Sequence, residues 1–141
     1  MDKKSLRLKI KKLRDSMGKD QRELESKILC KKILQLDEYK NARKILSFMN
    51  FGSEVEIERL NEKILEENKI LYLPRVEKDG TLSIVEYGKG YYDKLFLNNF
   101  STLKIAPIFD IQLVESIPYE EHDIKIDMII TKNEILRIKK Y

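Results

Sequence analysis

The chain of 141 residues is 42% hydrophobic and 37% charged, with a formal net charge of +4. This length and apolar content suit one domain with a buried core, and no apolar run is long enough to span a membrane. The single cysteine, Cys30, excludes a disulfide within the chain. It is typical of a small buried residue in a reducing cytoplasm, where we expect the protein.

Hydrophobic periodicity predicts two N-terminal helices, followed by strands that alternate with helices. Leu6, Ile10 and Leu13 recur at helical spacing; Gly18 ends this first helix and Asp20 caps the next. In chain order we expect helices over residues 3–17 and 21–36, a strand over 43–49, a helix over 54–68, strands over 69–73 and 81–86, a helix over 91–99, and strands over 103–109, 126–131 and 134–138.

Local signals set several element ends and the fold class. Ser53 with Glu56 three residues later is a capping-box pattern. Pro74 is expected to end its strand, and Asp79 followed by Gly80 is typical of a hairpin turn. The alternation of strands and helices favours the α/β class. We expect a single three-layer domain over residues 1–141, with a partly parallel sheet flanked by helices.

The strongest local signal is the segment GKGYYD at residues 88–93, between a predicted strand and a predicted helix. Its two glycines let backbone N–H groups approach an anion, Lys89 adds positive charge, and Asp93 offers a carboxylate oxygen to Mg²⁺. The spacing fits neither a P-loop nor a dinucleotide fingerprint, and such runs also occur in surface turns. The pattern alone leaves both an anion site and a surface turn open.

Three weaker clusters have a functional and a structural interpretation. Lys3 and Arg7, with Lys4 between them, share a helix face on which two cations can clamp a phosphate, although a solvated basic face is the simpler interpretation. Glu54 follows a strand, where a carboxylate usually caps a helix. The acidic run EEHD at 120–123, with Asp127 after it, offers metal ligands but is more often an exposed turn.

Together these segments resemble the 5-formyltetrahydrofolate cyclo-ligase family, also called methenyltetrahydrofolate synthetases. The similarity rests on the combination and order of five segments rather than on any one of them. They are KKSLR at 3–7, ILSFMNFGSE at 45–54, LYLPR at 71–75, GKGYYD at 88–93, and residues 112–131 with Ile117-Pro118, His122-Asp123 and DMIIT at 127–131.

The resemblance implies that the protein uses ATP and Mg²⁺ to convert 5-formyltetrahydrofolate to 5,10-methenyltetrahydrofolate, ADP and phosphate. ATP would phosphorylate the formyl oxygen, N10 would attack the activated carbon, and phosphate would leave. Such transfer needs charge neutralisation and alignment rather than a covalent nucleophile. The implied roles are ATP binding by Lys3, Lys4, Arg7, Gly88, Lys89, Gly90, Tyr91 and Tyr92; folate binding by Met49, Glu54 and Tyr92; catalysis by Lys89 and Tyr92; and Mg²⁺ binding by Asp93 and Asp123.

The chain departs from the family in one place. Family members carry a long stretch, including a central strand, between the strand at 81–86 and the GKGYYD segment, whereas here Tyr87 runs directly into Gly88. Losing a central strand would leave two sheet edges without a neighbour. We therefore expect a missing segment near residues 86–88, seen as a break in the backbone much longer than the normal Cα spacing of about 3.8 Å.

Two alternatives remain open. One is a shortened, inactive relative that only binds nucleotide. The other is a basic module that binds nucleic acid through its first helix; the lack of any aromatic residue in positions 1–19 counts against it. In weighing the net charge we rank compositional bias first, an anionic ligand second and nucleic acid third. The expected partners are a reduced folate and ATP, with no nucleic acid and no membrane, and we expect a monomer.

Overall fold

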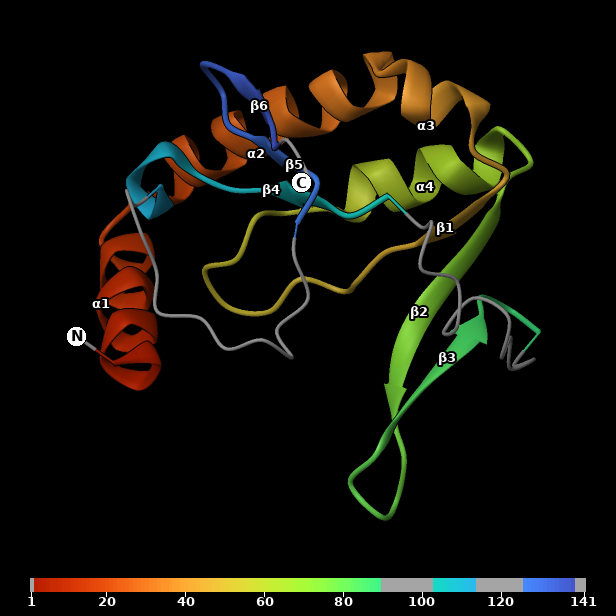
Figure 1. The fold of residues 1–141 in the computed structure, drawn as a ribbon, viewed down its shortest axis with the longest axis horizontal. Helices are drawn as coiled ribbons and strands as arrows, with labels where there is room; N and C mark the ends of the chain where they lie inside the picture. The colour runs from red at the N-terminus through yellow and green to blue at the C-terminus, as the bar shows by residue number, and fades with distance from the viewer. Residues whose placement is uncertain (1, 90–102, 114–125, 139–141) are drawn as a thin grey trace.

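The computed structural model describes residues 2–89, 103–113 and 126–138. Helices alternate with short strands (Figure 1), and no helix in these ranges is long and apolar enough to cross a membrane. The elements are α1 (Lys3–Asp15), α2 (Lys19–Gln35), α3 (Asp37–Asn41), β1 (Lys44–Leu46), α4 (Glu58–Glu66), β2 (Ile70–Val76), β3 (Leu82–Glu86), β4 (Ile105–Pro107), the 3₁₀ turn η1 (Asp110–Gln112), β5 (Met128–Ile130) and β6 (Ile135–Arg137).

The described strands form two three-stranded sheets with the same internal pattern. The first has the order β1-β2-β3, with β1 and β2 parallel and β2 and β3 antiparallel. The second has the order β4-β5-β6, with β4 and β5 parallel and β5 and β6 antiparallel. The predicted α/β class with parallel pairing is confirmed, and the strands are divided between two sheets.

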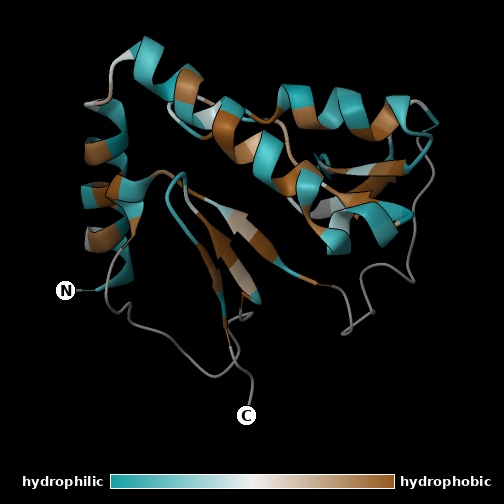
Figure 2. Cartoon of the chain, turned by 90° about the horizontal axis from the view of Figure 1, so that it is seen from above, coloured by the Kyte–Doolittle hydropathy of each residue, from teal (hydrophilic) through white to brown (hydrophobic). Residues whose placement is uncertain are grey.

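One hydrophobic core runs through both halves of the chain. Helix α2 packs against α4 and also against β5, and α4 packs against β2. Leu29 and Ile64 are fully buried, as are Phe109 and Ile130 from the second half. Figure 2 shows strands that are largely apolar and helices on which apolar and polar residues alternate. This is the pattern expected for helices that bury one stripe against strands buried from both sides.

Several element ends differ from the sequence-based prediction, and β1 ends at Leu46 instead of residue 49. Helix α4 begins at Glu58, not near Ser53, because the Ser53 hydroxyl donates to Asp15 Oδ1 (2.5 Å) and is not used as a helix cap. Strand β2 continues through Pro74 to Val76. Because β1 pairs only with residues 70–72, Pro74 has β3 alone beside it and its missing N–H is tolerated.

A short helix was not predicted. No break in the described backbone appears near residues 86–88, and the missing segment expected there stays a prediction. Helix α3 occupies the five residues after α2, where the buried Tyr39 supplies its core contact. At the junction the chain is continuous: the Lys89 N–H donates to the Glu86 carbonyl (3.2 Å), and Gly88 has φ +81°. A positive φ favours glycine and lets the chain turn tightly at the end of β3. The helix predicted over residues 91–99 lies outside the described residues.

Candidate functional site

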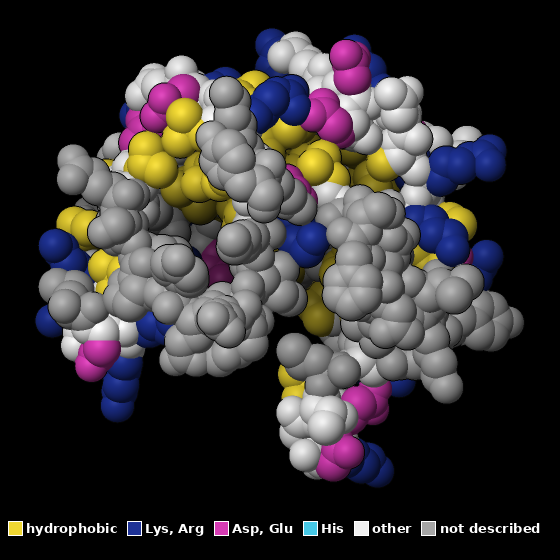
Figure 3. Space-filling view, viewed as in Figure 1, with side chains coloured by type: hydrophobic (Ala, Val, Ile, Leu, Met, Phe, Trp, Pro, Cys, Tyr) yellow, Lys and Arg dark blue, Asp and Glu magenta, His cyan; other side chains and the backbone are white. Residues whose placement is uncertain are grey.

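Helix α1 presents a basic surface. None of its residues is buried, and Lys4 and Arg7 are exposed while Lys3 is half-buried. Its first turn is capped by Asp2, whose carboxylate accepts the Ser5 N–H (2.7 Å); this hydrogen bond lowers the pKa of Asp2. Figure 3 shows Lys and Arg side chains along the left edge of the molecule, where α1 lies. The helix therefore offers several cations to solvent.

The loop over residues 49–54, called here the 49–54 loop, carries two of the three predicted folate contacts, Met49 and Glu54. The side chain of Met49 is 63% exposed and that of Phe51 is 84% exposed. Glu54 folds back on the loop: its Oε1 accepts the Phe51 N–H (2.7 Å), and its own N–H donates to the Phe51 carbonyl (3.2 Å). Gly52 between them has φ +58°. The carboxylate of Glu54 thus shapes the loop by holding the backbone of the exposed Phe51.

Side chains from two helices hold the 49–54 loop in place. The amide of Asn61 on α4 accepts the Ser47 hydroxyl (2.6 Å) and donates to the Phe48 carbonyl (3.0 Å), which fixes the chain just before the loop. At the other end the Ser53 hydroxyl donates to Asp15 at the end of α1. This hydrogen bond, followed by one from Lys11, lowers the pKa of Asp15. The loop and the basic helix are therefore joined directly.

The turn at Gly88 and Lys89 lies elsewhere. Lys89 is exposed, and its Nζ lies 3.5 Å from Glu86 Oε1 at the end of β3. Figure 1 shows α1 at the left end of the molecule and β3 towards the right, so the described structure does not bring Lys3 or Arg7 to this turn. The other residues predicted for this site, Gly90, Tyr91, Tyr92, Asp93 and Asp123, lie outside the described residues, and their roles stay predictions.

Across residues 2–89, 103–113 and 126–138, no group of three or more His, Cys, Asp or Glu side chains is suited to a metal ion. Asp127, which follows the predicted acidic run, accepts the Lys104 N–H through Oδ2 (2.8 Å) and thereby joins β5 to β4. A carboxylate at that position stabilises the sheet pairing, and the Mg²⁺ prediction depends on Asp93 and Asp123.

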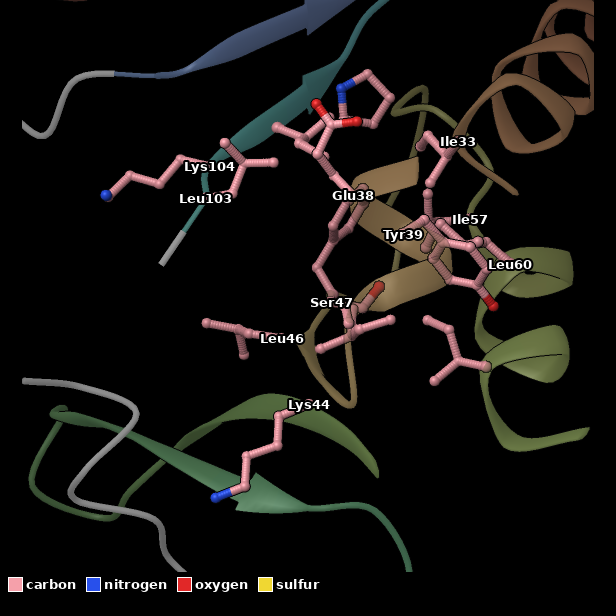
Figure 4. A pocket seen from close by; sticks show the side chains of 16 residues that line it. Ile33, Glu38, Tyr39, Lys44, Leu46, Ser47, Ile57, Leu60, Leu103 and Lys104 are labelled. Carbon is pink, nitrogen blue, oxygen red and sulfur yellow. The ribbon is translucent and has the colours of Figure 1, made fainter. Parts of the chain in front are cut away.

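A cavity of about 460 Å³ lies between β1 and β4. Figure 4 shows Leu46 and Ser47 on one side, Leu103 and Lys104 on the opposite side, and Tyr39 behind. It contains none of the residues predicted to bind ATP or folate. The lining residues are Ile33, Glu38, Tyr39, Ala42, Lys44, Ile45, Leu46, Ser47, Phe48, Ile57, Leu60, Ile64, Leu103, Lys104, Ile105 and Pro107.

Sequence reasoning missed two residues of the 49–54 loop region. Phe51 was a detectable candidate, because an aromatic residue between Asn50 and Gly52 in a predicted loop has little chance of being buried. The sequence did not single out Asn61, because a single Asn in a predicted helix is usually interpreted as an exposed residue. Only the structure shows that Asn61 is 7% exposed and that its amide organises the chain before the loop.

Comparisons with known proteins agree on one family. A family model described as the 5-formyltetrahydrofolate cyclo-ligase family matches the chain over residues 1–88 and 86–132. A relative from Mus musculus, named 5-formyltetrahydrofolate cyclo-ligase, is 21% identical over 187 residues, covering 91% of this chain and 92% of the relative.

Two solved structures share the fold. A 5,10-methenyltetrahydrofolate synthetase from Mycoplasma pneumoniae has a TM-score of 0.75 and 18% identity, covering 94% of this chain and 99% of that chain. A 5,10-methenyltetrahydrofolate synthetase from Aquifex aeolicus has a TM-score of 0.80 and 22% identity, covering 100% of this chain and 95% of that chain. Similarity at this level of identity is similarity of fold.

The family match is divided at the junction between the halves. Its two parts meet at residues 86–88, where Glu86 ends β3 and the Gly88 turn begins. The alignment to the mouse relative runs over 187 residues, whereas this chain has 141 in all, so at least 46 residues of the relative have no counterpart here.

Proposed function

Because the chain belongs to the 5-formyltetrahydrofolate cyclo-ligase family, we propose that it uses ATP and Mg²⁺ to cyclise 5-formyltetrahydrofolate to 5,10-methenyltetrahydrofolate, releasing ADP and phosphate. Membership identifies an enzyme, a ligase of folate metabolism. The observation that carries the proposal is the extent of the family match. It includes the basic helix α1, the 49–54 loop and the residues around Lys89. A monomeric, cytoplasmic enzyme acting on small molecules completes the proposal.

The cations proposed for ATP are accessible. Lys4 and Arg7 are three residues apart on α1, and Lys3 and Arg7 are four apart, so all three project from neighbouring positions of one helical turn. Lys89 is exposed beside Gly88, whose N–H lies in a tight turn. In the proposed reaction these charges would bind phosphate oxygens, which requires the Lys89 turn and α1, apart in Figure 1, to come together around ATP. Lys89 would then offset negative charge on the phosphoryl group as it moves to the formyl oxygen.

The 49–54 loop suits the aromatic part of a folate. Met49 and Phe51, two residues apart, both expose apolar surface, and stacking on an exposed aromatic or thioether side chain is favourable for a flat ring system. The Glu54 carboxylate adds an acceptor at the same loop. Phe51 is therefore proposed to contact the folate together with Met49 and Glu54, the two residues of this loop predicted from the sequence.

Mg²⁺ is proposed on the chemistry of its donors. Asp93 and Asp123 offer the carboxylate oxygens that this hard cation prefers. When bound, the ion would neutralise charge on the ATP phosphates. The residues of this chain do the remaining work: the cations orient the phosphates, and the 49–54 loop orients the folate so that N10 reaches the formyl carbon.

A second candidate is a shortened relative that binds nucleotide without completing the cyclisation. It is favoured by the absence of a counterpart to at least 46 residues of the mouse relative, and we propose that the missing stretch belongs at residues 86–88. In that case the cations of α1 and the turn keep their affinity for ATP, while no methenyltetrahydrofolate forms.

An absorbance assay separates the two candidates. Purified protein is mixed with 5-formyltetrahydrofolate, and formation of methenyltetrahydrofolate is followed with ATP and Mg²⁺, and with either omitted. Cyclisation predicts product only in the complete mixture; product formed without ATP, or no product at all, contradicts it. Calorimetry with ATP then tests nucleotide binding alone.

The matched variants for that calorimetry are Lys89→Ala and Lys78→Ala. Both side chains are exposed, but Lys78 lies in the hairpin turn between β2 and β3. Loss of a charge-assisted hydrogen bond should weaken ATP binding by roughly 10- to 150-fold for Lys89→Ala. Lys78→Ala should bind ATP as the parent does. Equal affinity in the two variants would mean that Lys89 does not contact the phosphates.

A further inference from the structure

One hydrogen bond joins the two elements that the proposed function assigns to different substrates. The Ser53 hydroxyl donates to Asp15 Oδ1 (2.5 Å), although the two residues are 38 positions apart in the chain. Ser53 precedes Glu54 in the 49–54 loop, and Asp15 is the last residue of α1, the helix that carries Lys3 and Arg7. Figure 1 shows the segment after β1, drawn in yellow, extending towards α1. The element proposed for folate and the element proposed for nucleotide therefore share a direct contact.

Asp15 lies where the helix itself does not favour a carboxylate. The C-terminal end of a helix carries partial negative charge, so a carboxylate is stabilised in the first turn rather than in the last. Lys11, one turn earlier, lies 2.9 Å from Asp15 Oδ2, but the two side chains are 63% and 45% exposed, and exposed pairs contribute little. Ser53 is only 8% exposed, so its hydroxyl is the partner least open to water. The contact with the loop is therefore the interaction that best accounts for a carboxylate at this position.

Few buried contacts hold either element. No residue of α1 is buried, and among the described elements this helix packs mainly against η1. Met17, just past the end of α1, is the nearest residue in sequence that belongs to the core. The chain before the loop is held by the Asn61 amide, while Met49 and Phe51 in the loop are exposed. Segments with so little burial open at a low free-energy cost, so a ligand that binds to one of them loses affinity through the cost of ordering it.

We infer that Asp15 and Ser53 are positioning residues that couple nucleotide binding on α1 to folate binding on the 49–54 loop, an inference that rests on the proposed function. Because their hydrogen bond makes the ordering of the two elements a single event, a nucleotide that orders α1 also orders the loop. The folate then binds at a smaller ordering cost. The coupling is reciprocal, so the folate raises the affinity for nucleotide by the same factor.

Equilibrium titrations measure the coupling without turnover. Calorimetry gives the affinity for a non-hydrolysable ATP analogue in the absence and in the presence of saturating 5-formyltetrahydrofolate, with Mg²⁺ throughout. In the parent the folate should raise this affinity roughly fivefold or more. In Ser53→Ala and in Asp15→Ala the ratio of the two affinities should fall to about one, and the double variant should lose no more than either single variant. The absence of coupling in the parent, or an unchanged ratio in Ser53→Ala, would overturn the inference.

Matched variants separate this hydrogen bond from general damage to the helix end. The Ser16 hydroxyl, next to Asp15, donates to the Leu13 carbonyl of its own helix (2.6 Å), so Ser16→Ala removes a hydroxyl but keeps the loop contact. This variant should show the parent ratio. Asp15→Asn retains an oxygen that can accept the Ser53 hydroxyl, and it should keep most of the coupling that Asp15→Ala loses. If Ser16→Ala also loses the coupling, or if Asp15→Asn loses as much as Asp15→Ala, the inference is wrong. Far-UV circular dichroism checks that each variant is folded.

Hydrogen exchange followed by NMR tests the coupling with the ATP analogue alone. The Phe51 and Glu54 amides are both hydrogen-bonded within the loop, far in sequence from the cations of α1. Adding the analogue should slow their exchange in the parent and in Ser16→Ala, because ordering α1 also orders the loop. It should leave their exchange unchanged in Ser53→Ala. Equal slowing in all three proteins would show that the loop is ordered by another route and would overturn the inference.

The outcomes distinguish this inference from the proposed function. A parent that binds neither the ATP analogue nor 5-formyltetrahydrofolate would refute both. A parent that binds both ligands and forms methenyltetrahydrofolate, but whose Ser53→Ala variant keeps the parent ratio, would refute the coupling and leave the proposed function standing.

Discussion

Replacing Asn61 with alanine should loosen the 49–54 loop at a measurable cost in stability. The amide makes two hydrogen bonds, one from the Ser47 hydroxyl and one to the Phe48 carbonyl. Each contributes about 0.5–1.5 kcal/mol net, and the 7% exposed site gives the groups left behind little access to water. We expect Asn61→Ala to lower the free energy of unfolding by about 2–3 kcal/mol.

Urea unfolding followed by circular dichroism at 222 nm measures this loss, with Glu62→Ala as the control. Glu62 is the exposed neighbour on the same helix, and its substitution should change stability by no more than about 0.5 kcal/mol. Ser47→Ala removes one hydrogen bond and should cost about 1 kcal/mol. If the proposed folate contact is correct, Asn61→Ala also raises KM for 5-formyltetrahydrofolate. A stability loss no larger than that of Glu62→Ala would refute the role given to the amide.

Three further predictions concern Leu29 in the core, the hydrogen bond from Ser53 to Asp15, and the thiol of Cys30. Leu29→Ala should cost about 2–5 kcal/mol in urea unfolding, whereas Leu24→Ala on the exposed side of the same helix should cost much less; the two side chains are 0% and 61% exposed. Because hydrogen bonds from Ser53 and Lys11 lower the pKa of Asp15, their stabilisation is present above the unfolded value of about 3.9 and is lost as pH falls through the folded pKa. The difference in free energy of unfolding between the parent and Ser53→Ala should therefore shrink on acidification from pH 6 to pH 3. A constant difference would contradict the stabilising role of the hydrogen bond from Ser53 to Asp15. Burial raises the pKa of Cys30, so its reaction with a thiol reagent at pH 7 should be slow in the native protein and fast in urea; equal rates would place the thiol at the surface.

Local sequence patterns predicted most of the helices and strands, but they did not predict how the strands assemble into two sheets. The spacing of Leu24, Ile28, Ile33 and Leu36 predicted α2, and the apolar run around Leu71 predicted β2. The predicted helix face was only partly right, because Leu24 is 61% exposed while Leu29 is fully buried. The start of α4 was predicted too early because the capping-box pattern assumes that the Ser53 hydroxyl caps the helix. In the structure this hydroxyl instead donates to Asp15, 38 residues away in the chain. A local sequence pattern cannot predict a hydrogen bond to a residue so far away in the chain.

The candidate site likewise has features that the sequence predicts and features that depend on the fold. The basic face of α1 was predictable because it depends on neighbours in sequence. The loop was predicted only from residue 50, and the structure adds Met49 to it, because β1 ends at Leu46. Their connection through Ser53 and Asp15 depends on the fold, as does the separation of α1 from the Lys89 turn. The resemblance to a family supplied roles for these residues, and the structure supplies the contacts by which the chain holds some of them.

Helix α2 explains how one core persists although the described strands form two sheets. It packs on α4, which covers β2 of the first sheet, and on β5 of the second. Lys32 near its end donates to the Thr131 carbonyl beyond β5 (2.7 Å). In an α/β domain a continuous sheet normally carries this connection, and helices only cover it. Here α2 makes the connection, because residues from α2, α4 and β5 belong to one buried cluster. The two sheets are therefore held to a common core by a helix that packs against elements of both halves.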